Sequence, residues 1–305
     1  MLEKVVIEIE DQTEAEAMAE QIPKLELAGL QVEYYDKNPM SGTGGEAVLF
    51  VTDNPDNVWK KYGTDCCIVL YLTEANSEKW WKGISYAVLS VRGLEPDFLE
   101  KVYRRYAGAP WDILETERLL IREMTEENLD DLYRIHNQPG IEDFVAPLET
   151  DREKQREILK SYIRKVYPIF GFGMWMVVEK ESGRCIGRVG LQMESSIRTS
   201  CRDDEVRMSE QVPELGFIME ISEQHKGYCQ EACHAVLQYG FEELEMDKIC
   251  AVVAENNIAS AKLCFRLGGR AQKKDGQYLF YWSKMKPELF DEDEKGKNDF
   301  EYTSR

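Results

Sequence analysis

The chain has 305 residues, of which 43% are hydrophobic and 10% aromatic, so it can fold and is long enough for two ordinary domains. Its formal net charge of -19 argues against nonspecific binding to nucleic acid, because neutralisation of phosphates by basic side chains supplies most of that affinity. Cationic partners suit this charge, although acidity also simply keeps a protein in solution.

Neither membrane insertion nor secretion is indicated. No stretch approaches the roughly 20 consecutive apolar residues of a membrane span, and the start MLEKVVIEIEDQ lacks the regions of a signal peptide. The 8 cysteines form no spaced disulfide framework, which fits a reducing compartment. We therefore expect a soluble cytoplasmic protein without membrane or nucleic-acid partners.

Three potential metal ligands, His225, Cys229 and Cys233, are spaced so that a helix would place them on one face. A tetrahedral zinc site usually takes paired ligands from two segments, and no second segment is visible. We expect no metal and interpret the two cysteines as packing residues.

Residues 1–112 alternate apolar runs with helix-like polar segments. We expect strands over 4–9, 30–35, 47–51, 67–72 and 86–91, and helices over 14–21, 55–62 and 96–106. This alternation predicts a small domain with a parallel, doubly wound sheet. Residues 51–55 (VTDNP) weakly resemble the later half of a haloacid dehalogenase-like fold, whose Asp-x-Asp strand end is missing. Because that motif is missing, we expect a noncatalytic role in gating, partner binding or formation of a homodimer.

The predicted boundary is the stretch GAPW at residues 108–111, after which residues 113–286 form a second domain. Its expected strands are 118–122, 174–179, 185–191, 214–219, 248–254 and 277–283, and its expected helices are 126–137, 152–167, 227–244 and 259–267. One mixed sheet flanked by helices accommodates them, so the fold class is α/β (α+β). Residues 194–207 suggest an exposed loop, and the acidic stretch 287–305 a flexible tail.

The most informative segment is ELGFIMEISEQHKGYCQEA at residues 214–232, where a strand enters a polar loop whose glycine opens a long helix. The unpaired N–H groups at such a helix start lie at the positive end of the helix dipole, which suits a diphosphate. Gly227 lets the backbone approach the ligand, and His225 or Lys226 adds charge. Taken alone, the pattern also fits an ordinary helix start.

This segment resembles the acetyl-coenzyme A signature of the GNAT superfamily, in the branch of ribosomal-protein and other N-terminal acetyltransferases. The matching residues are Gln224, Gly227, the strand start at 214–217 and the pair at 231–232. Residues 254–269 (AENNIASAKLCFRLGG) resemble a second block of the family, and residues 117–122 resemble its first strand. The sequence departs from the branch at three positions: His225 replaces Gly, Cys229 replaces Ala and Gly269 replaces Phe.

The resemblance implies acetyl-coenzyme A as cosubstrate and direct attack of a neutral amine on its thioester. The implied cofactor-binding residues are Ile218, Met219, Glu220, Gln224, His225, Lys226, Gly227, Tyr228, Cys229, Asn257 and Ser260. The first three would bind the pantetheine arm through their backbone.

Three residues are candidates for proton transfer. Glu214 is the candidate base because it lies on that strand and partial burial would raise its pKa, although it suits loop orientation or amine binding equally well. Ser260 and Cys264 are candidate acids for the leaving thiolate. Helix capping by Ser260 and packing by Cys264 are the alternatives.

The favoured hypothesis is an N-acetyltransferase that modifies a primary amine of a small molecule or a protein amino terminus. The acidic residues Glu142 and Asp143 belong to a loop that could line the amine pocket. One alternative is a noncatalytic module that senses acyl-coenzyme A or binds a protein on a GNAT fold. Another is a phosphorylated ligand bound by the amino-terminal domain.

Overall fold

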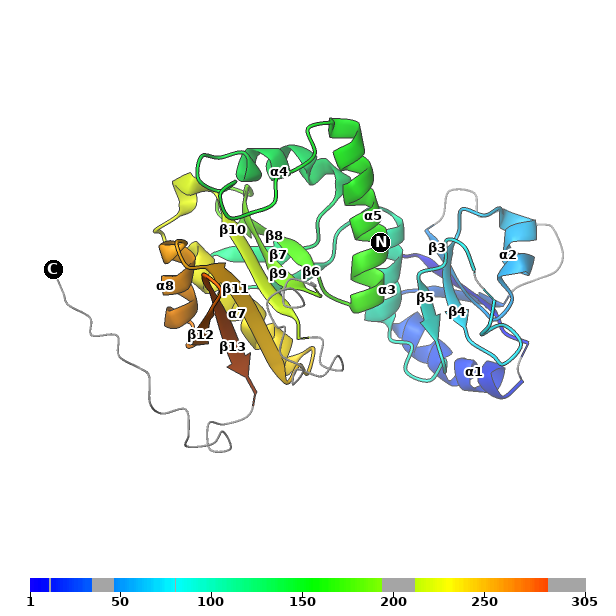
Figure 1. Cartoon of the computed structure of the whole chain (residues 1–305). Coiled ribbons are helices and arrows are strands. Elements are labelled where there is room, and N and C mark those ends of the chain that lie inside the picture. Colours follow the sequence, from blue (N-terminus) through cyan, green and yellow to red (C-terminus); the bar gives the residue numbers. More distant parts are fainter. Residues whose placement is uncertain (11, 35–46, 80, 194–211, 285–305) are drawn as a thin grey trace. The chain divides into compact units, whose positions relative to one another are not determined.

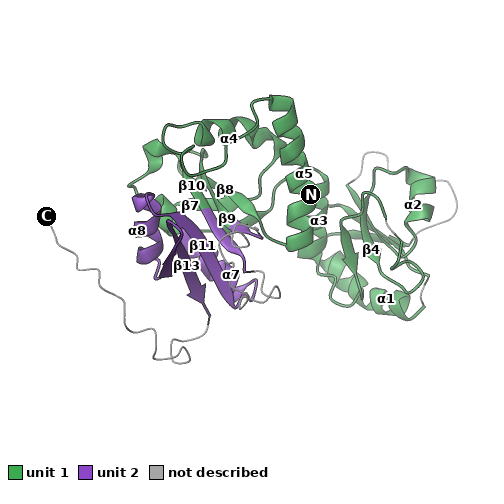
Figure 2. Ribbon diagram, in the orientation of Figure 1, with its two compact units in different colours: residues 1–190, 217–232 green, residues 191–216, 233–305 purple. Residues whose placement is uncertain are grey.

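The computed structural model describes residues 1–10, 12–34, 47–79, 81–193 and 212–284 (Figure 1). The predicted loop at 194–207 and tail at 287–305 lie outside these residues. Two compact units are distinguished, one of residues 1–190 and 217–232 and the other of residues 191–216 and 233–305 (Figure 2). The predicted domain boundary at residue 112 stays a prediction.

The first sheet is parallel and has the strand order β2-β1-β3-β4-β5. Its strands are β1 (Lys4–Glu8), β2 (Gln31–Tyr34), β3 (Val48–Thr52), β4 (Cys67–Tyr71) and β5 (Tyr86–Val88). Alternate residues of the strands belong to two apolar clusters. One cluster includes Ile7 and residues of α1 (Gln12–Leu27) and α3 (Pro96–Tyr106), and the other includes Val6 and α2 (Pro55–Tyr62). Helices thus cover both faces, which confirms the doubly wound sheet.

The bounds of α2 and α3 match the prediction because each begins with a proline, whose missing N–H costs nothing at the first helical position. The predicted end of α1 at residue 21 is wrong. The helix continues through Pro23 to Leu27. Leu25 is fully buried in the apolar cluster, so packing outweighs the hydrogen bond that Pro23 cannot donate.

The second sheet has the order β12-β13-β11-β10-β9-β8-β7-β6. Its strands are β6 (Asp112–Glu115), β7 (Leu119–Arg122), β8 (Met174–Glu179), β9 (Cys185–Gln192), β10 (Glu214–Met219), β11 (Lys248–Ala254), β12 (Arg270–Lys274) and β13 (Gln277–Ser283). The accompanying helices are η1 (Glu126–Asn128), α4 (Leu129–His136), α5 (Arg152–Phe170), η2 (Ile221–Glu223), α7 (Tyr228–Glu242) and α8 (Ile258–Arg266). β10 and β11 are parallel, whereas β7/β8, β8/β9 and β11/β13 are antiparallel. The mixed sheet is confirmed.

Two strands of this sheet, β6 and β12, were not predicted. They are its two edges. No residue of β6 or β12 is buried, so neither strand carries the apolar pattern that identified the inner strands. Among the described residues, no helix has the length and apolar character needed to cross a membrane.

Candidate functional site

The loop between β10 and α7 is open to solvent at its tip. β10 ends at Met219, η2 follows, and α7 begins at Tyr228, so residues 224–227 form the turn into the helix. His225, Lys226 and Gly227 are all exposed. His225 therefore does not close the loop, and the amino end of α7 stays accessible to an anion.

Two residues of this loop have a left-handed backbone. The φ angle is 62° at His225 and 87° at Gly227. Glycine suits such angles because it lacks a Cβ, which gives a physical reason for the glycine that the resembling branch carries in place of His225. A Cβ built on Gly227 would lie 3.3 Å from Nη2 of Arg118. A side chain at position 227 would therefore strain the turn and crowd Arg118.

Arg118, which directly precedes β7, ties the loop to the first turn of α7. Its Nε donates to Oε2 of Glu231 at 2.7 Å, its backbone N–H donates to Oε1 of Glu231 at 3.0 Å, and Nη1 donates to the carbonyl of Lys226 at 3.0 Å. The guanidinium also lies 4.4 Å from the ring centroid of Tyr228. We call this set of contacts the Arg118 strap. Arg118 and Glu231 are 113 residues apart in the sequence, so no local pattern could have revealed their contact.

Thr116 and the Arg118 strap together favour the ionised form of Glu231. Partial burial opposes ionisation, but hydrogen bonds from Thr116 and from Arg118 outweigh it and lower the pKa of Glu231. Lys226 adds a second cation at the loop, with Nζ 2.7 Å from Oε2 of Glu223. Arg118 and Lys226 thus both lie at the turn into α7, each paired with a glutamate.

The end of β10 is held by buried carboxylates. Glu220 is 8% exposed, forms an ion pair with Arg134, and lies 3.1 Å from Nη2 of Arg184. Its backbone N–H donates to the carbonyl of Ile186 at 2.8 Å. The predicted backbone contact of Glu220 with a pantetheine arm is therefore restricted to its carbonyl, because the N–H already has a partner.

The side chains of Gln224 and Cys229 lie beside the loop and do not cover its tip. The Gln224 side chain folds back, and its Nε2 donates to the carbonyl of Met219 at 3.1 Å. Tyr228 is buried and its hydroxyl donates to Glu179, whereas Cys229 is half-buried in the first turn of α7. None of these side chains obstructs the exposed tip.

β10 and β11 share one register pair, Glu214 with Cys250. Among the described residues, Leu215 to Met219 have no register partner in β11. Where a strand has no register partner on one side, its backbone N–H and C=O groups can bind an extended ligand. Glu214 is 8% exposed, and its charge adds to the effect of burial in raising the pKa of Cys250 to about 12.

The other predicted residues lie around α8. The helix is capped by Asn257, whose Oδ1 accepts from the backbone N–H of Ser260 at 3.1 Å. Capping by Ser260, one of the two predicted alternatives, is therefore wrong. Cys264 is fully buried in α8. A Cβ built on Gly269 would lie 2.8 Å from Cζ2 of Trp282, which explains why no aromatic side chain stands there.

The family model described as the acetyltransferase (GNAT) domain matches residues 118–270, about half of the 305 residues. The chain belongs to the GNAT acetyltransferase family. YkkB of Bacillus subtilis (strain 168) is 25% identical over 159 residues, which are 51% of this chain and 83% of that protein. The uncharacterized N-acetyltransferase YoaA of the same organism is 24% identical over 182 residues, 55% of this chain and 88% of that protein.

A solved acetyltransferase from Agrobacterium tumefaciens str. C58 is 21% identical and covers 56% of this chain and 94% of its own, with a TM-score of 0.44. The GNAT fold implies acetyl-coenzyme A as cosubstrate. The matched family region leaves the first, parallel sheet outside.

In this GNAT protein His225, Cys229 and Cys233, the potential metal ligands considered from the sequence, do not share one helical face. α7 begins at Tyr228, so His225 lies in the preceding loop and is not on the same helix as Cys229 and Cys233. Among the described residues, no group of three or more His, Cys, Asp or Glu side chains is arranged to hold a metal ion.

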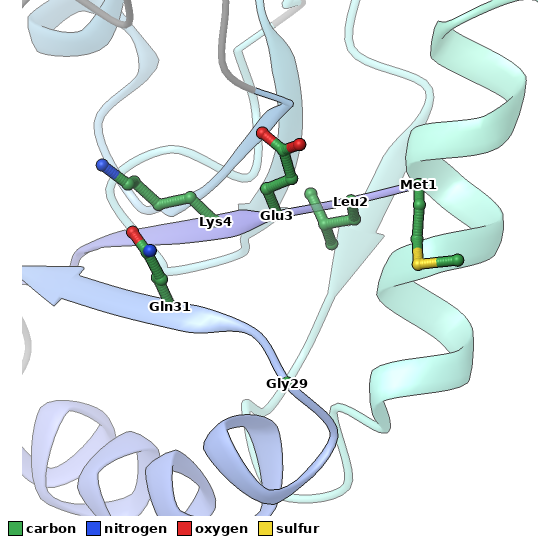
Figure 3. Close-up of a pocket in the computed structure, with 6 residues that line it drawn as sticks. All are labelled: Met1, Leu2, Glu3, Lys4, Gly29 and Gln31. Carbon is green, nitrogen blue, oxygen red and sulfur yellow. The ribbon is translucent and has the colours of Figure 1, made fainter.

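A hollow of about 320 Å³ lies at the amino ends of β1 and β2, remote in the chain from the GNAT signature (Figure 3). Its charged side chains are already engaged. Glu3 accepts from the backbone N–H of Ala47 at 3.2 Å, and Nζ of Lys4 lies 3.1 Å from Glu33. We assign it no chemistry, since ligands of parallel sheets bind at the opposite, carboxyl edge.

The carboxyl edge of the parallel sheet is acidic. Glu8 ends β1, is 8% exposed, and accepts from Thr52 Oγ1 at 2.9 Å and Asn57 Nδ2 at 2.8 Å. Burial raises the pKa of Glu8. Asp53 follows β3 and accepts from the backbone N–H of Glu10 at 2.8 Å. These carboxylates disfavour the phosphorylated ligand that was one alternative for this domain.

Proposed function

We propose that the GNAT region transfers an acetyl group from acetyl-coenzyme A to a primary amine of a small molecule or a protein amino terminus. The observation that carries the proposal is the exposed, left-handed loop at His225–Gly227, held at the amino end of α7 by the Arg118 strap. It combines accessible backbone, a helix amino end and two cations, which together suit a diphosphate.

The strand that precedes the loop suits the arm of the cosubstrate. Because the loop follows the carboxyl end of β10, an arm that runs along the strand from the loop extends toward Glu214. Five residue steps separate Met219 from Glu214, about 16 Å at the usual rise of a strand. Backbone groups of Ile218 and Met219 would hold the arm.

Bound acetyl-coenzyme A supplies an acetyl group activated as a thioester. Glu214 would take a proton from the acceptor ammonium, since a buried carboxylate near the attack site can hold that proton. Ser260, which is half-buried and does not cap α8, would give a proton to the departing thiolate. Cys264 is the weaker candidate for this step because its thiol is fully buried.

The test combines binding with turnover. Calorimetry measures the affinity of the full chain for acetyl-coenzyme A, and release of free thiol measures turnover over a panel of primary amines and amino-terminal peptides. Binding without turnover on any acceptor would favour the rival function, a module that senses acyl-coenzyme A. Absence of binding would exclude both functions.

A matched pair of variants tests the loop itself. Gly227→Glu places a carboxylate at the diphosphate position and should abolish binding. Gly183 also has a positive φ, 69°, in the β8–β9 turn, and a Cβ there meets nothing within 4 Å. Gly183→Glu imposes a similar backbone strain and charge but should bind acetyl-coenzyme A like the wild type. Equal affinity of the two variants would contradict the loop assignment.

A further inference from the structure

Arg188 is a cation inside β9 without a carboxylate partner among the described residues. It pairs with Met176 of β8, and both neighbours in its own strand, Gly187 and Val189, are buried. Its Nε is buried and has no hydrogen-bond partner, while the side chain as a whole stays partly exposed. Burial lowers the pKa of Arg188. A buried charge normally requires a counter-ion, so the lack of a described carboxylate beside the Arg188 guanidinium needs a physical reason.

Within the described part of the chain, the side chain at hydrogen-bond distance from Arg188 is a neutral imidazole. Nη1 of Arg188 lies 2.9 Å from Nε2 of His136, which is 6% exposed at the end of α4. Burial, together with the charge of Arg188, lowers the pKa of His136 to about 4. Arginine N–H groups can only donate, so Nε2 of the neutral imidazole accepts from Nη1. His136 thus orients the guanidinium without neutralising it.

A second buried arginine in the same unit, Arg105, has a carboxylate that neutralises its charge. The side chains of Arg105 and Glu123 are 7% and 2% exposed, and both Glu123 oxygens accept from Arg105 Nε at 3.0 Å. Arg188 has no such partner in the described parts of the chain. Its Nη1 is used by His136, which leaves the edge formed by Nε and Nη2 for a carboxylate.

Arg188 lies next to the strand that we assign to the thioester arm. A Cβ built on Gly187 would lie 2.5 Å from the carbonyl oxygen of Ile218, so β9 and β10 touch one residue before Arg188. The segment after α4 also contacts η2, which follows β10, because Oε1 of Gln138 accepts from the backbone N–H of Ile221 at 2.7 Å. Arg188 and His136 are therefore placed where an acceptor would approach the arm.

We propose that Arg188 binds a carboxylate of the acceptor, so that the substrates are amines that also carry a carboxylate, such as amino acids, rather than polyamines. The inference rests on the proposed function and assigns its substrate class. One carboxylate would accept from Nε and Nη2 together, while His136 keeps Nη1 in place. Because Nε is covered in this structure, the guanidinium must pivot about its Nη1–His136 contact to present that edge to the ligand.

The first test compares amino acids with their carboxamides as acceptors, since each amide keeps the amine and the side chain but lacks the carboxylate. We expect kcat/KM to be about tenfold or more higher for the acids, the usual effect of a charge-assisted hydrogen bond. Arg188→Gln should remove this preference, and Arg188→Lys should restore part of it. Arg156→Gln is the control, because Arg156 lies on α5 with Nε 3.7 Å from Glu153 and should keep the wild-type ratio. A preference for amides, or an unchanged ratio in Arg188→Gln, overturns the proposal.

The second test does not depend on turnover. The side-chain Nε–H signal of Arg188, assigned by its loss in Arg188→Gln, is followed by NMR during titration with acetate and, separately, with acetamide. A saturable shift with acetate alone supports the subsite, and no response to acetate overturns it. If no amine is acetylated, the proposed transferase function fails, while this titration still decides whether Arg188 binds carboxylates.

Discussion

Removal of the Arg118 strap should weaken binding of acetyl-coenzyme A. Arg118→Ala deletes the hydrogen bonds from Nε to Glu231, at 2.7 Å, and from Nη1 to the Lys226 carbonyl, at 3.0 Å. Buried charge-assisted bonds contribute about 1.5–3 kcal/mol each, but exposed pairs contribute about 1 kcal/mol or less. The Arg118 and Glu231 side chains are 41% and 20% exposed, so we take the lower end of these energies for each bond. A loss of about 1–2 kcal/mol corresponds to a Kd increased about 5- to 30-fold.

Calorimetry with two ligands separates the effect on the loop from a general loss of structure. Acetyl-coenzyme A should bind more weakly to Arg118→Ala, whereas S-acetylpantetheine, which lacks the diphosphate, should bind as it does to the wild type. Arg152 offers a matched control because it pairs with Asp130 and lies 4.9 Å from the ring centroid of Tyr133. The reasoning is refuted if Arg118→Ala keeps wild-type affinity for acetyl-coenzyme A, or if Arg152→Ala loses as much.

Three further outcomes are expected. Glu123→Gln should lower the free energy of unfolding by about 3–5 kcal/mol in urea denaturation, because Arg105 stays buried without its counter-ion, and a loss below about 1 kcal/mol would contradict this. The free energy of unfolding should fall as the pH drops from about 6.5 to about 4, because folding lowers the pKa of His136 to about 4 and only the unfolded chain binds that proton in this range. His136→Asn should remove up to about 3 kcal/mol of this pH dependence. An unchanged pH profile in the variant would exclude the assignment. Glu214→Gln should lower kcat and remove the acidic limb of the pH–rate profile, and wild-type kinetics would eliminate Glu214 as the base.

The sequence predicts inner elements well because their signals are local. β8, β10, β11 and β13 have the predicted bounds, since each carries a run of buried apolar residues. The edge strands β6 and β12 were missed because exposed edges carry no such run. The cofactor loop was likewise visible locally, as a strand, a glycine and a long helix.

The contacts that support the site could not be predicted in this way. The Arg118 strap joins segments 113 residues apart, and no sequence pattern near Arg118 predicts its contact with Glu231. Arg188 did leave a signal in the sequence, namely a single charged residue within the otherwise apolar run CIGRVGL. Such a residue can equally face solvent, and only the packing of α4 against β9 shows that its Nε is buried.

The charge of the protein and the position of Arg188 bear on how an acceptor is selected. A polyamine is attracted at long range by a net charge of -19, an effect that salt screens and that does not distinguish one cation from another. A zwitterionic amino acid has no net charge and gains little from this field. Its recognition must then come from contact, through a carboxylate that binds Arg188 while His136 holds Nη1 at 2.9 Å. Contact between partly buried groups is screened much less, so selection by Arg188 would persist at ionic strengths that abolish long-range attraction.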